Sequence, residues 1–89
     1  MKTGGWSPQL PVTSEDIEVF NLALEGFVGS SFIPLTVSKQ VVNGINYCFI
    51  AKSTPVTLNP TEKLVKVYIS AVPADAKPHL TEIKDLVTI

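Results

Sequence analysis

Two predicted strands and the turn between them lie in residues 35–53, LTVSKQVVNGINYCFIAKS. Residues 35–42 and 45–53 are rich in the β-branched and aromatic side chains that strands favour. Between them stands Asn43-Gly44, a pair typical of tight hairpin turns because both residues tolerate positive φ. This stretch therefore predicts a β-hairpin, and the hairpin makes the sheet around it antiparallel.

Downstream of the hairpin the chain continues as strands. Residues 54–60 are polar and bounded by prolines, as in a loop. Residues 62–72 alternate apolar and polar side chains, which is typical of a strand with one buried face. A turn over residues 73–78 and a last, weaker strand over residues 80–88 complete the pattern.

Upstream of the hairpin the apolar period is that of a helix. Thr13 or Ser14 can cap its N-terminus, and Glu15 and Asp16 stand in the first turn, where the helix dipole favours acidic side chains. The spacing predicts one amphipathic helix of about four turns. Its apolar face would carry Ile17, Phe20, Leu24, Phe27, Val28 and Ser31. Residues 1–12 show no period and are predicted to be an extended arm.

The order of these elements predicts a single α+β domain over residues 1–89, in which the helix and one face of an antiparallel sheet bury each other. Hydrophobic residues make up 45% of the chain and charged residues 17%, enough for one modest core. The only cysteine is Cys48, so no intramolecular disulfide can form, which suits a reducing compartment. We therefore expect a cytoplasmic protein, or a secreted one if a signal peptide has been removed.

Several classes of partner and chemistry find no support in the composition. The net charge is −1 and the lysines are scattered, so we expect no nucleic-acid partner. No stretch approaches the roughly 20 apolar residues of a membrane span, so we expect no membrane partner. His79 stands alone in a proline-flanked turn and Cys48 in mid-strand, and no motif predicts a metal site, a cofactor or a catalytic centre. A small hydrolase or lyase would need converging acids, for which the sequence offers no candidate.

Three segments place apolar or glycine residues where a soluble protein would favour polar ones. They are Gly4-Gly5 in the arm beside Trp6, the hairpin tip Gln40-Val41-Val42-Asn43-Gly44, and the turn Val72-Pro73-Ala74. Each segment taken alone is ordinary, because Asn-Gly and X-Pro turns are common. Together they predict exposed apolar surface, which often marks a binding site.

The same segments carry a resemblance to the cystatins, and within them to the stefin type that lacks disulfides. Gln40-Val41-Val42-Asn43-Gly44 resembles the Gln-Xaa-Val-Xaa-Gly loop of that family, and Asn46-Tyr47 follows it as in stefins. Gly4-Gly5 resembles the glycines of the stefin arm, and Val72-Pro73 resembles the Leu-Pro of its second hairpin loop. The resemblance extends over nearly the whole chain.

The resemblance implies a long N-terminal helix wrapped by a five-stranded antiparallel sheet, with a short first strand within residues 7–12. It implies a reversible, non-covalent inhibitor of papain-like cysteine proteases such as cathepsins, not an enzyme. Residues 1–6 would be a flexible inhibitory arm that enters the protease cleft together with the two hairpin tips. The implied protease-binding residues are Thr3, Gly4, Gly5, Gln40, Val41, Val42, Asn43, Gly44, Val72, Pro73 and Ala74.

Two of the predicted protease-binding residues depart from the family pattern, and several alternatives stay open. Asn43 replaces the alanine most common in the loop, and Thr3 is a polar residue for a subsite that usually takes apolar groups. Trp6 has two interpretations, packing against the sheet or touching the protease, and we favour packing. The alternative is a cystatin-like fold that serves as a peptide- or ligand-binding or oligomerising module without inhibitory activity. We expect a monomer, with a domain-swapped dimer as the other assembly.

Overall fold

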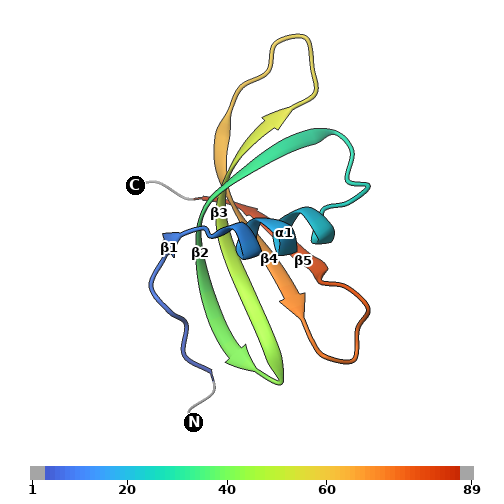
Figure 1. Cartoon of the computed structure of the whole chain (residues 1–89). Coiled ribbons are helices and arrows are strands. Elements are labelled where there is room, and N and C mark those ends of the chain that lie inside the picture. The colour runs from blue at the N-terminus through green and yellow to red at the C-terminus, as the bar shows by residue number, and fades with distance from the viewer. Residues whose placement is uncertain (1–3, 87–89) are drawn as a thin grey trace.

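The computed structural model describes residues 4–86, in which one helix and five strands form a single unit (Figure 1). The strands make one antiparallel sheet in which every strand pairs with its neighbour in the sequence. The predicted α+β class and the five-stranded antiparallel sheet are thereby confirmed. In chain order the elements are β1 (Leu10–Pro11), α1 (Ser14–Ala23), β2 (Ser30–Val42), β3 (Gly44–Pro55), β4 (Lys63–Ala71) and β5 (His79–Asp85). The described residues contain no helix with the length and apolar character that a membrane crossing requires.

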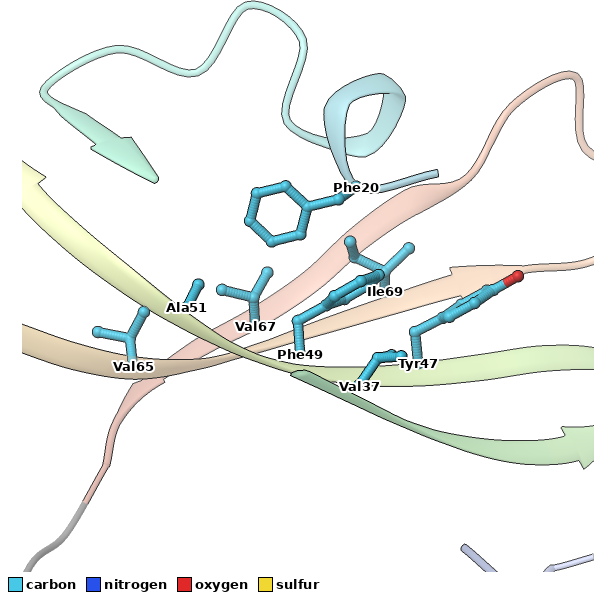
Figure 2. Packing of buried hydrophobic residues seen from close by; sticks show 8 residues of the cluster. All are labelled: Phe20, Val37, Tyr47, Phe49, Ala51, Val65, Val67 and Ile69. Carbon is cyan, nitrogen blue, oxygen red and sulfur yellow. The ribbon is translucent and has the colours of Figure 1, made fainter. Parts of the chain in front are cut away.

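The hydrophobic core lies between α1 and one face of the sheet. Phe20 of α1 points onto the sheet and meets Phe49 edge to face, with the ring centroids 4.9 Å apart (Figure 2). The sheet contributes alternate residues of its central strands, as strand geometry requires. These buried residues are Val37, Tyr47, Phe49, Ala51, Val65, Val67 and Ile69. The apolar residues of the alternation predicted within residues 62–72 therefore form the buried face of β4.

Helix α1 is shorter than the sequence predicts, because it ends at Ala23 rather than near residue 31. Gly26 and Gly29 both have positive φ, +83° and +98°, values that are incompatible with a continuing right-handed helix. The apolar period beyond residue 24 instead serves the connection to β2. There Phe27 packs edge to face with Phe32 at 5.2 Å, while Val28 is 85% exposed. The expectation of a long helix was wrong.

Strand β2 is correspondingly longer than predicted, since it begins at Ser30 rather than at residue 35. Ser31, which the helical period had placed on the helix, lies in this strand. Pro34 is tolerated within β2 because a register irregularity follows it and because β1 pairs only with Thr36 and Val37, which leaves this part of β2 at the sheet edge. The short first strand implied within residues 7–12 is present as β1.

The N-terminus of α1 is fixed by a capping box. The Thr13 hydroxyl accepts a hydrogen bond from the Asp16 N–H, and the Asp16 carboxylate accepts one from the Thr13 N–H. The other Asp16 oxygen lies 2.7 Å from the Lys39 ammonium of β2. Burial raises the pKa of Asp16, but the hydrogen bonds from Lys39 and Thr13 outweigh it and hold the pKa below its usual value. This carboxylate thus joins the start of α1 to the sheet.

Replacing Asp16 by asparagine tests this connection, because the amide oxygen can still accept the hydrogen bond from the Thr13 N–H but carries no charge. We expect the free energy of unfolding at neutral pH to fall by about 1–3 kcal/mol. Because the folded-state pKa lies below the usual 3.8, the charge stabilises the fold above that pH and loses its effect as the pH falls below it. The difference between Asp16→Asn and the wild type should therefore shrink in acid.

Urea denaturation at several pH values measures this effect. Glu18→Gln, on the exposed side of the same helix, serves as the matched control and should change the free energy of unfolding little at any pH. A loss in Asp16→Asn that stays constant from neutral to acidic pH would contradict the assignment of the effect to the charge.

Candidate functional site

The β2–β3 turn and the β4–β5 loop project from the same end of the sheet, and the loop between β3 and β4 lies at the other end (Figure 1). At the first of these turns Val42 and Gly44 are register partners, so the turn contains Asn43 alone. Of these two turn residues only Gly44 has positive φ, +118°, so the hairpin uses the tolerance of the glycine and not that of Asn43. The result is a narrow tip at the end of the longest strands.

The two tips touch through Gly44. A Cβ atom added at Gly44 would stand 2.9 Å from the Cα of Val72 and would overlap the carbonyl oxygen of Ala71. Real Cβ atoms do not approach backbone atoms so closely, so glycine is required by packing as well as by its φ. The backbone of the first tip therefore rests directly on the start of the β4–β5 loop, where Val72 and Pro73 follow one another.

The arm reaches the same end of the sheet along the outer edge of β2. The Gly4 N–H lies 3.4 Å from the Val41 carbonyl oxygen, and the Gln40 side-chain amide donates to the Gly4 carbonyl at 2.8 Å. The Asn46 side chain in turn donates to the Gln40 side-chain oxygen at 2.9 Å. Gln40 is thus a clamp that holds the arm beside the first tip.

Further hydrogen bonds align the arm with β2 below this clamp. The Ser7 N–H donates to the Lys39 carbonyl at 2.8 Å, the Lys39 N–H donates to the Ser7 hydroxyl at 2.9 Å, and the Ser38 hydroxyl donates to the Ser7 carbonyl. Trp6 forms a bridge with Gln40, and its ring stands edge-on to that of Tyr68 at 6.3 Å. Sequence periodicity carries no signal for any of these contacts, because they join an irregular segment to a strand.

The site presents apolar and backbone groups to solvent. Val41, Asn43, Pro73 and Ala74 are exposed, and Val42 and Val72 are half-buried. The N–H of Asp75 donates to the Val72 carbonyl at 3.1 Å, which closes the second loop. No side chain with a charge stands among the predicted residues, so recognition by this surface would depend on shape and apolar contact.

The structure brings together almost all of the residues predicted from the sequence. Gly4 and Gly5 of the arm, the tip from Gln40 to Gly44 and the loop from Val72 to Ala74 meet at one end of the molecule. Thr3 lies outside the described residues. Gly5 is exposed, and an added Cβ would meet nothing within 4 Å, so the fold itself does not demand a glycine there.

The remaining chemistry-bearing residues lie away from this end or are engaged within the fold. Cys48 is buried on the outer face of the sheet, and His79 at the start of β5 has its Nε2 atom 3.3 Å from the Asp75 carboxylate. Among residues 4–86, no three His, Cys, Asp or Glu side chains gather into a group that could hold a metal ion. No protein-family model, curated protein or solved structure matches the chain.

Proposed function

We propose that this protein is a reversible, non-covalent inhibitor of papain-like cysteine proteases of the cathepsin type. The observation that carries the proposal is the meeting of three segments, distant in the sequence, at one end of the sheet. The arm at Gly4, the tip at Val42 and the loop at Pro73 together form a wedge, the term used below for these three segments. The resemblance to stefins in the same three segments points to the same partner.

The wedge has the composition that a cleft-filling surface needs. Protease–inhibitor interfaces typically bury about 800 Å² on each partner, which is more than one narrow turn can supply. Three adjoining segments supply a longer surface, and two of them are hairpin ends already held in place by the sheet. Held segments lose little conformational entropy on binding, which favours tight association.

The arm has a separate role in the proposal. Glycine has no Cβ, so the backbone at Gly4 and Gly5 can pass close to the catalytic thiol of a protease. Within the fold, an added Cβ at Gly5 would meet nothing within 4 Å, so the fold does not require glycine at this position. A protease surface pressed against the arm would require it, because a side chain there would collide with that surface. The arm leaves the cleft before it presents a peptide bond to the thiol, so the protease does not cleave it. Met1, Lys2 and Thr3 would occupy the substrate subsites next to the thiol.

Titration of active papain with the protein tests the proposal. Activity should fall in proportion to the protein added and reach zero at one equivalent, and it should return when the complex is diluted or competed with substrate. Papain that keeps its full activity at an excess of the protein would contradict the proposal and favour a binding or oligomerising module instead.

Deleting residues 1–4 should weaken inhibition of papain by about 10- to 100-fold, the size of effect expected when one of several contacting segments is lost. The free energy of unfolding should change little, because in the described chain the fully buried core begins at Phe20 and the first hydrophobic residue packed against it is Val12. The inhibition constant and a denaturant titration measure the two effects. Leu58→Ser, at a 98% exposed position beyond β3, is the control and should leave both unchanged. A truncated protein that inhibits as well as the full chain would remove the arm from the wedge.

A further inference from the structure

The face of the sheet opposite α1 carries a hollow that the wedge does not use. Its volume is about 400 Å³, within the range of 300–1,000 Å³ that small-molecule sites occupy. Two aromatic rings, the thiol of the free cysteine, an aliphatic side chain, polar groups and one ammonium group line it. The lining residues are Trp6, Gln9, Ser38, Cys48, Ile50, Lys66 and Tyr68.

The walls of this hollow are held in place before any ligand arrives. Gln9 donates to the Cys48 carbonyl at 3.0 Å and accepts from the Thr36 hydroxyl at 2.7 Å. Trp6 stands edge-on to Tyr68 at an interplanar angle of 79°, so rings from the arm and from β4 form one corner. Trp6 nevertheless remains 45% exposed, which leaves aromatic surface open to a further planar group.

The charge next to this corner is positive and only partly compensated. Lys66 of β4 and Lys84 of β5 are register partners, and like charges directly opposite each other destabilise a pair of strands. The Lys84 ammonium stands 5.9 Å from the centre of the Tyr68 ring and has Glu82 at 3.7 Å. Among residues 4–86, Lys66 forms no ion pair, so its ammonium is the group that an incoming anion would meet.

We propose that this hollow binds a small aromatic carboxylate. The planar ring of such a ligand packs against Trp6 and Tyr68 over the side chain of Ile50. Its carboxylate pairs with Lys66 and relieves the repulsion between Lys66 and Lys84. This site shares Trp6 with the arm but contains none of the predicted protease-binding residues, and it does not depend on the proposed inhibition.

The probe for this site is 2-naphthoate, and 2-naphthalenemethanol is its uncharged counterpart. Titrations followed by ¹H–¹⁵N correlation spectra of the full chain should show saturable binding of 2-naphthoate with a dissociation constant below about 1 mM. The shifts should centre on the Trp6 indole N–H and on the amides of Ile50, Lys66 and Tyr68. The uncharged probe should bind at least about fivefold more weakly, because it lacks the ionic hydrogen bond.

Two variants separate the proposed site from general attraction to lysines. Lys66→Gln should weaken 2-naphthoate binding by about tenfold, since it removes the ammonium at the hollow. Lys52→Gln removes a lysine from the same face of the sheet that does not line the hollow, and it should change binding less than twofold. Absence of binding, equal binding of the two probes, equal effects of the two variants, or shifts centred on α1 would each overturn the proposal.

Discussion

Replacing Phe20 by alanine is expected to lower the free energy of unfolding by about 3–5 kcal/mol, the usual cost of removing a buried phenylalanine ring. Phe20 is 2% exposed and is the only residue of α1 that belongs to the fully buried part of the core in the described chain. Its ring covers Phe49, which is completely buried. Because small domains have total stabilities of about 5–15 kcal/mol, this single change should bring the protein close to unfolding at ambient temperature.

Chemical denaturation followed by circular dichroism measures the loss. Ile17→Ala is the matched control, since Ile17 lies one turn earlier on α1 and is 38% exposed; it should cost about 1 kcal/mol or less. Equal losses in the two variants would mean that α1 is not held to the sheet through Phe20.

Replacing Gly44 by alanine is expected to lower the free energy of unfolding by about 2–5 kcal/mol, since two costs combine. A Cβ at this position overlaps the backbone at Ala71 and Val72, and the φ of +118° is unfavourable for any side chain. The first tip must therefore move away from the β4–β5 loop. Under the proposed function, the inhibition constant for papain should rise as well, because two segments of the wedge separate.

Gly26→Ala isolates the conformational part of this cost. Gly26 also has positive φ, +83°, but an added Cβ would meet nothing within 4 Å. Denaturation should show a loss of about 1–2 kcal/mol for Gly26→Ala, and inhibition of papain should not change. If Gly44→Ala and Gly26→Ala lower the free energy of unfolding equally, the contact between the two tips does not contribute to stability.

The sheet could be predicted from the sequence because its strands carry their own signals. Within residues 62–72, Val65, Val67, Ile69 and Ala71 alternate with Lys66, Tyr68 and Ser70, and the first three of these apolar residues form the buried face of β4. The hairpin was predictable from Asn43-Gly44, although only Gly44 takes positive φ. Local pattern and tertiary burial agree in these segments, so sequence reasoning succeeds there.

The helix boundary could not be predicted from the apolar period. Residues Phe27 and Val28 continue the spacing of Phe20 and Leu24, yet they follow the end of α1. Gly26 and Gly29 each lower helix propensity by about 1 kcal/mol. In a prediction from sequence, a long apolar period can outweigh a cost of that size. The positive φ values of these two glycines end the helix, and a hydrophobic pattern does not show the φ of a residue.

Sequence reasoning identified the residues of the candidate site but not the contacts between them. The segments around Gly4, Val42 and Pro73 were identified from their unusual composition and their resemblance to stefins. The clamp by Gln40 and the packing of Trp6 on Tyr68 depend on how the arm is aligned with β2. Such alignment joins residues more than 30 positions apart, and no local periodicity records it.

The measurement that tests the wedge most directly is a ¹H–¹⁵N correlation spectrum of the protein with one equivalent of papain, whose catalytic thiol carries a small methylthio group to prevent proteolysis. We expect the amides of Gly4, Val42, Gly44 and Ala74 to shift or broaden together, while those of the loop over residues 56–62 at the far end keep their positions. Perturbation centred on that loop, or a spectrum that papain leaves unchanged, would contradict the account.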